Sequence, residues 1–135
     1  MSILEPEKVE ILNRVIQLSK EYQSLIDELS PKNTTLRESL EHRDTEDGKK
    51  INEAKQRLIK FLDKQSFEDV QMIETIMYIG RDPEEGDDLL EPESLYSEVF
   101  SSLRWDTKEI EIKHISQKTP LNEYLEDGMK LLRLK

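Results

Sequence analysis

Eight carboxylates lie between Asp82 and Glu98, with no lysine or arginine among them. Carboxylates at that density can ligate a hard divalent cation, meet a basic partner protein, or remain hydrated in a polar connection. Their spacing and the elements around them decide among these roles. The eight residues are Asp82, Glu84, Glu85, Asp87, Asp88, Glu91, Glu93 and Glu98.

The run from Asp82 to Glu93 has the length of a twelve-residue calcium loop, but its glycine is misplaced. Such loops carry ligands at alternating positions and a glycine at the sixth position, where the chain turns sharply. With Asp82 first, Glu84 and Glu93 fall on ligand positions, yet Asp87 is sixth and Gly86 is fifth. We therefore predict a solvated acidic loop and assign no metal-binding residue.

Other residue types that carry catalysis do not form a complete arrangement. His42 and His114 lie far apart in the sequence, no serine lies in a nucleophile-elbow motif, and the four glycines are isolated. Glu38 and Glu41 have the spacing of half of the metal site in helical nucleotide pyrophosphohydrolases, but the sequence shows no convincing second acidic pair. We predict no catalytic residue and no cofactor. A metal-dependent hydrolase using Glu38 and Glu41 is the alternative of a different class.

The composition is that of an acidic soluble protein. Hydrophobic residues make up 35% and charged residues 37% of the 135 residues, and the net charge is −10. Such a surface repels phosphate backbones and anionic membranes, so we expect no direct binding to nucleic acid or membrane. The lack of cysteine excludes disulfides and thiolate metal sites. With no signal-peptide pattern and no long apolar stretch, we expect a cytoplasmic protein.

A long helix is predicted over 6–29, with an apolar seam along one side. Pro6 suits its first turn and Pro31 ends it. The seam residues recur in steps of four and three, the heptad spacing of helices that pack along their length. Neighbouring apolar residues widen the seam and favour packing inside the domain; the alternative is a dimer, so we expect a monomer or homodimer. The seam consists of Ile11, Val15, Leu18, Tyr22, Leu25 and Leu29.

Two polar segments interrupt the helices that follow. Residues 30–48 are predicted to be a polar connection, with Gly48 as a breaker, and the acidic loop covers 81–91. Between them we predict a helix over 49–64 and a central apolar helix capped by Ser66. Gly80 is expected to close that central helix, because glycine tolerates the left-handed conformation at helix ends.

The last third of the chain is also predicted to be helical. Helices are expected to begin at Pro92 and at Thr119-Pro120, and Asp106 with Glu109 predicts the cap of another. Residues 109–115 partly alternate like a strand, but no partner strand is visible. We therefore predict an all-α fold, a single compact domain over 1–135 of about five to seven helices.

Three stretches resemble a small bacterial family catalogued as a domain of unknown function (number 3775). They are MIETIMYIGRD, LYSEVFSSLRW and TPLNEYLEDGMKLL, which cover roughly the last half of the chain. Ile79-Gly80-Arg81 and Pro120 through Met129 match the family's helix-ending and closing elements. Met129, where the family tends to have leucine, and the insertion from Asp82 to Glu91 depart from it. The resemblance implies an all-helical domain and no particular activity.

These observations predict a non-catalytic acidic protein that binds another protein with a basic surface. An inhibitor that imitates nucleic acid and occupies a DNA- or RNA-binding protein is the second binding hypothesis. Arg81 follows a helix end, and the single tryptophan, Trp105, is a candidate interface anchor if it is exposed. The predicted partner-binding residues are Arg81, Asp82, Glu84, Glu85, Asp87, Asp88 and Trp105.

Overall fold

The computed structural model describes residues 5–29 and 46–134, and every regular element in these ranges is helical. The all-α prediction is therefore confirmed for the described residues, and their six α-helices agree with the expected five to seven. The pair Glu38 and Glu41 lies outside the described residues. The elements are α1 (Pro6–Leu29), α3 (Glu46–Asp63), α4 (Phe67–Arg81), the 3-10 turn η1 (Asp87–Leu89), α5 (Pro92–Ser102), α6 (Lys108–Gln117) and α7 (Leu121–Leu131).

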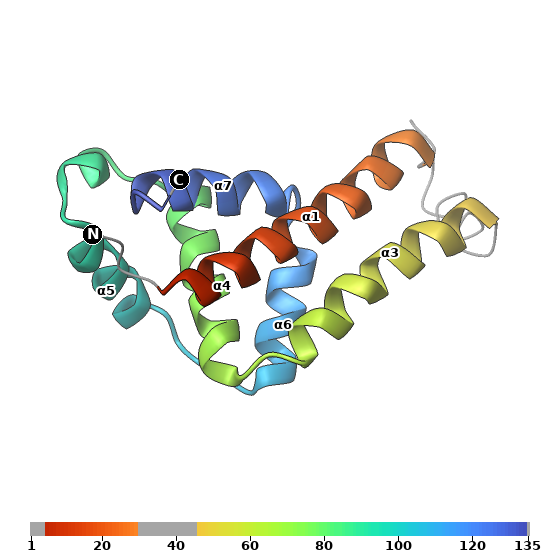
Figure 1. The fold of residues 1–135 in the computed structure, drawn as a ribbon, viewed down its shortest axis with the longest axis horizontal. Coiled ribbons are helices and arrows are strands. Elements are labelled where there is room, and N and C mark those ends of the chain that lie inside the picture. Colours follow the sequence, from red (N-terminus) through yellow and green to blue (C-terminus); the bar gives the residue numbers. More distant parts are fainter. Residues whose placement is uncertain (1–4, 30–45, 135) are drawn as a thin grey trace.

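The predicted long N-terminal helix is present as α1, which begins at Pro6 as expected. It runs beside α3, and the two helices extend together beyond the others at one end of the molecule (Figure 1). Val15 and Leu18 of the seam are buried in the domain's own core. The first half of the seam therefore packs internally, whereas Tyr22 and Leu25 are only half-buried.

The centre of the fold is α4, which contacts α5, α6 and α7. A helix that is apolar on all sides must be surrounded to be stable. This condition is met, because α4 is buried around its whole circumference, from Val70 to Gly80 apart from the partly exposed Gln71 and Tyr78. The Ser66 cap is confirmed, since its hydroxyl accepts a hydrogen bond from the Asp69 amide at 3.1 Å.

The prediction that Gly80 closes the central helix is wrong. The helix continues through Gly80 to Arg81, and Gly86 is the described glycine with a positive φ, 92°. Gly80 instead lies where α4 crosses α7: a Cβ atom built on it would be 1.8 Å from the carbonyl oxygen of Tyr124. Gly128 has the same role on α7, where its Cβ would be 2.2 Å from the carbonyl oxygen of Ile76. The two glycines therefore let the backbones of α4 and α7 touch.

Two further helix boundaries differ from the predictions. Gly48 is not a breaker, because α3 already begins at Glu46. Residues 109–115 are helical, as predicted, but the cap of α6 is Thr107 rather than Asp106: its hydroxyl accepts from the Ile110 amide at 3.3 Å.

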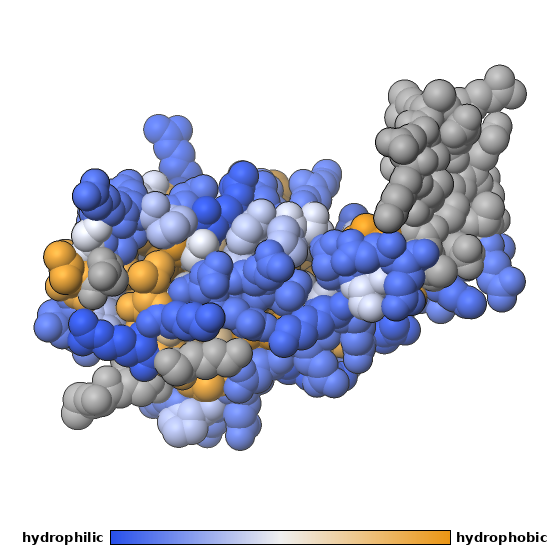
Figure 2. Space-filling view, turned by 90° about the horizontal axis from the view of Figure 1, so that it is seen from above, coloured by the Kyte–Doolittle hydropathy of each residue, from blue (hydrophilic) through white to orange (hydrophobic). Residues whose placement is uncertain are grey.

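The surface of the molecule is largely hydrophilic. Figure 2 shows blue residues over most of one face, with hydrophobic residues in orange toward the end where Figure 1 places η1 and α5. None of the described helices combines the length and the apolar character that a membrane crossing requires.

Candidate functional site

The acidic loop is an ordered connection between α4 and α5. Asp82 is the C-cap of α4, and its amide donates to the carbonyl of Tyr78 at 3.0 Å. The carboxylate of Asp87 accepts a hydrogen bond from the Glu84 amide at 2.8 Å. Gly86 supplies the left-handed conformation that the turn before η1 needs. The loop therefore presents its side chains from a backbone with defined turns.

Both charged and apolar side chains of this loop face solvent. Asp82, Glu84 and Glu85 are exposed, and the side chain of Asp88 lies outside the described part of the structure. Leu89 is 83% exposed, the largest value among the large hydrophobic residues described. A leucine in that position gives up the free energy of burial, about 1.5–3 kcal/mol for such a side chain.

A small hollow separates the loop from α5. Its volume is about 140 Å³, and it combines an apolar floor with an acidic rim. The floor includes Leu95, which is buried, and the rim includes carboxylates from both sides of the hollow. The lining residues are Ile79, Asp82, Glu84, Asp87, Leu95, Glu98, Val99 and Ser102.

The other two predicted partner-binding residues lie in different places. Arg81 is exposed in the last turn of α4, where a cation interacts favourably with the free carbonyls. Trp105 is half-buried and its ring packs on Phe100, with the ring centroids 5.1 Å apart. Trp105 follows the C-terminus of α5, whereas the loop precedes its N-terminus.

The loop carboxylates whose side chains are described form no group of converging metal ligands. Among the residues whose side chains are described, one group of three metal-ligating residues has its ligand atoms within 4.8 Å of one another, and it lies elsewhere. That group comprises Glu74, Glu111 and His114. We call these three residues the buried carboxylate cluster.

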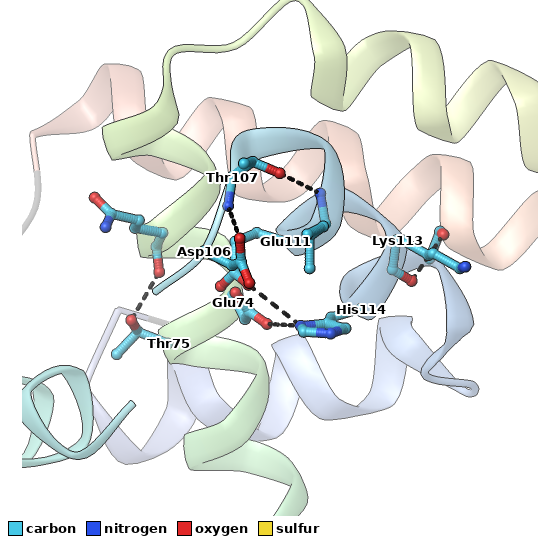
Figure 3. Close-up of polar contacts among 10 residues, drawn as sticks. Glu74, Thr75, Asp106, Thr107, Glu111, Lys113 and His114 are labelled. Atoms are coloured by element: carbon cyan, nitrogen blue, oxygen red, sulfur yellow. Dashed lines mark hydrogen bonds and ion pairs between the residues drawn. The ribbon is translucent and has the colours of Figure 1, made fainter. Parts of the chain in front are cut away.

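The buried carboxylate cluster joins the central helix to α6. Nδ1 of His114 lies 3.5 Å from Oε1 of Glu74 and 3.3 Å from Oε1 of Glu111. Figure 3 shows the carboxylates of α4 and α6 directed toward one edge of the imidazole ring. Both glutamate side chains are 2% exposed, whereas that of His114 is 45% exposed. The histidine therefore lies between the buried acids and solvent.

Local helix geometry explains this arrangement. Glu111 and His114 are three residues apart, so they occupy one face of α6 in adjacent turns. The Thr107 cap fixes where α6 begins, and the buried Ile112 and Ile115 belong to a helix that packs against both α3 and α4. Glu74 lies between the buried residues Ile73 and Thr75 of α4, so its carboxylate is held away from water.

Burial and the second acid change the electrostatics of Glu74. Desolvation, followed by a hydrogen bond and repulsion from Glu111, raises the pKa of Glu74 to about 9. The positive charge of Lys118 acts in the opposite direction. Desolvation, and then the field of Glu74, also raises the pKa of the neighbouring Tyr78. Near neutral pH, and without a bound cation, Glu74 therefore carries the proton and can donate it to the carboxylate of Glu111.

Sequence reasoning did not find this cluster, although the sequence contains one signal for it. Glu74 is the one charged residue in the segment VQMIETIMYIG, the most apolar stretch of the chain. Burying a carboxylate in such a helix costs free energy unless a partner pairs with it. The partners come from α6, which the sequence places beyond a loop and another helix.

The chain was compared with protein families, curated proteins and solved structures. No protein-family model, no curated protein and no solved structure matches this chain. The resemblance of its second half to the domain of unknown function therefore stays a prediction.

Proposed function

We propose that the protein binds another protein with a basic surface and that the acidic loop is its docking surface. The observation that carries the proposal is Leu89, an 83% exposed leucine within a run of carboxylates that has no countercharge. Exposed apolar side chains surrounded by polar residues are typical of protein interfaces. The carboxylates steer a basic partner, and Leu89 supplies the apolar area that holds it.

The hollow beside the loop supports the basic character of the partner. A lysine or arginine has an apolar stem and a charged head. The floor at Leu95 and Val99 suits the stem, and the carboxylates of Asp82, Glu84 and Glu98 at the rim suit the head. We therefore propose that a single basic side chain of the partner enters this hollow while Leu89 contacts an apolar surface nearby.

An inhibitor that imitates nucleic acid is a special case of this proposal. In that case the basic partner is a DNA- or RNA-binding protein, and added nucleic acid displaces it. The hydrolase alternative rests on Glu38 and Glu41, which lie outside the described residues, so no geometry supports it.

Removing the loop charges is expected to abolish partner capture without unfolding the protein. We propose a variant with Glu84→Gln, Glu85→Gln and Asp87→Asn, in which the asparagine keeps an oxygen for the Glu84 amide. Immobilised wild-type protein should retain a basic protein from its native cell extract and release it at high salt, because exposed charges are screened over about 8 Å at physiological salt. The melting temperature should stay within a few degrees, since the loop carboxylates repel one another.

A matched control distinguishes docking from general acidity. Glu53, Glu123 and Asp127 are exposed on other helices, and their neutralisation changes the net charge equally. The control variant should retain the partner, and a Leu89→Ser variant should lose it at low salt as well. Equal capture by the loop variant and the control variant would show that the acidic loop is not the docking surface.

A further inference from the structure

We propose that Glu74, Glu111 and His114 bind one divalent transition-metal ion. The site is separate from the acidic loop, since it joins α4 to α6 rather than α4 to α5. The proposal therefore does not depend on the protein-binding function. It departs from the sequence-based expectation that the chain has no metal site.

Two buried oxygens in the cluster lack hydrogen-bond donors. Oε2 of Glu74 and Oε1 of Glu111 accept no hydrogen bond from any described group, although both residues are almost completely buried, at 2% and 1% exposure. Buried polar atoms are nearly always satisfied in folded proteins. Two carboxylates in contact can be satisfied either by a shared proton or by a cation between them. A cation between the two carboxylates gives both of them a positive partner, and it also uses the histidine.

The distances within the cluster suit ligands of a common ion. Oxygen and imidazole ligands lie about 2.1 Å from such a metal, so two ligands in a tetrahedral or octahedral shell are roughly 3.0–3.4 Å apart. Nδ1 of His114 lies 3.3 Å from Oε1 of Glu111 and 3.5 Å from Oε1 of Glu74. Both separations are long for hydrogen bonds. The separation from Glu111 lies within the range for neighbouring ligands, and the separation from Glu74 lies just above it.

The ligand set indicates the class of ion. Two carboxylates and one imidazole are typical donors for Zn²⁺, Mn²⁺, Fe²⁺ or Co²⁺, whereas Mg²⁺ and Ca²⁺ prefer oxygen ligands alone. Two negative charges balance a divalent cation, and the burial of both acids keeps the screening of their attraction by water weak. The exposed edge of His114 provides a route of entry, and three protein ligands leave coordination positions for water.

Metal titration of the chelator-stripped, full-length chain tests the proposal. Zn²⁺ and Mn²⁺ followed by calorimetry should each bind in a one-to-one ratio in the low micromolar range or tighter, and Mg²⁺ and Ca²⁺ should bind far more weakly. Co²⁺ provides a second readout, because its visible absorption reports nitrogen and oxygen ligation directly. The bound metal should also raise the melting temperature.

Isosteric variants locate the site. Glu111→Gln and His114→Gln should each weaken binding by about 100-fold or more, because changes outside the ligands themselves already cost about 10–100-fold. Glu109→Gln, an exposed glutamate of the same helix, should bind metal like the wild type. Circular dichroism in chelator verifies that each variant is folded, and Glu74→Gln replaces any variant that is not.

Two results would overturn the proposal. One is the absence of saturable binding of Zn²⁺, Mn²⁺ and Co²⁺ below millimolar concentration, which would show that the acids are held together by a proton alone. The other is unchanged binding in both Glu111→Gln and His114→Gln, which would place the ion at another part of the chain.

Discussion

Replacing Gly80 with alanine is expected to lower the melting temperature by about 10 °C or more, on the basis of roughly 3 kcal/mol of overpacking. The direction is opposite to that of most such changes, because alanine in a helix interior is usually more stable than glycine by about 1 kcal/mol. At Gly80 the new methyl group would be 1.8 Å from the carbonyl oxygen of Tyr124. That atom belongs to the backbone of α7, so no side-chain rotation relieves the contact.

The cost of Gly80→Ala arises from the separation of two helices. To make room, α7 must move away from α4, and the buried side chains of Leu125 and Met129 then lose contact with the core. Gly128→Ala should have a similar effect, since its methyl group would be 2.2 Å from the carbonyl oxygen of Ile76. Thermal unfolding followed by circular dichroism measures both.

Gly86→Ala is the matched control for this prediction. A Cβ on Gly86 has no neighbour within 4 Å, so only the positive φ of 92° opposes alanine. The expected loss is about 1–2 kcal/mol, the cost of a left-handed conformation for a residue with a side chain. A Gly80→Ala protein that melts at or above the wild-type temperature would contradict the close packing of α4 on α7.

The sequence predicts helices well here because their signals are local. The start of α1 at Pro6 and the Ser66 cap both follow from residues within one turn of the helix end. The role of Gly80 does not follow from nearby residues, because it depends on contact with α7, which is distant in the sequence. A glycine at the end of an apolar run fits both a helix end and a helix crossing. Only the path of α7 distinguishes the two.

The candidate site shows the same limit more strongly. The acidic loop could be predicted, because its charge and its glycine and proline residues lie in one segment. The buried carboxylate cluster could not, because its ligands come from α4 and α6, which meet only when the core forms. The sequence marks Glu74 as a charge in an apolar helix but does not identify Glu111 and His114 as its partners.

Glu74→Gln is expected to stabilise the metal-free protein at alkaline pH. The pKa of Glu74 is raised from 4.5 to about 9 in the folded state, so between these values the folded chain binds more protons than the unfolded chain. The free energy of unfolding then falls as the pH rises, by at most about 1.4 kcal/mol per pH unit for one proton. The stability that the folded chain gains by holding the proton of Glu74 is fully present below pH 4.5 and is lost as the pH rises through about 9.

Glutamine removes this dependence because its amide does not titrate. It can still donate a hydrogen bond to Glu111. The groups that face it also remain: His114 of α6, the C-cap residue Lys118, and Tyr78 of α4. The difference in unfolding free energy between Glu74→Gln and wild type should therefore grow in favour of the variant from pH 5 to pH 8, on the order of 1 kcal/mol or more per unit. Urea unfolding in the presence of a chelator measures it, and Glu68→Gln, at an exposed position of the same helix, is the control variant.

The same pair of proteins also separates a proton from a cation as the group that holds the two acids together. If an ion binds, adding Zn²⁺ at pH 8 should stabilise the wild type and leave Glu74→Gln nearly unchanged, which reverses their order of stability. A difference that does not vary with pH in chelator would mean that Glu74 is ionised in the folded state and would contradict the raised pKa. The expected result is that the wild type is less stable than Glu74→Gln without metal and more stable than Glu74→Gln with metal. This reversal would show that the bound ion compensates for the burial of the Glu74 carboxylate.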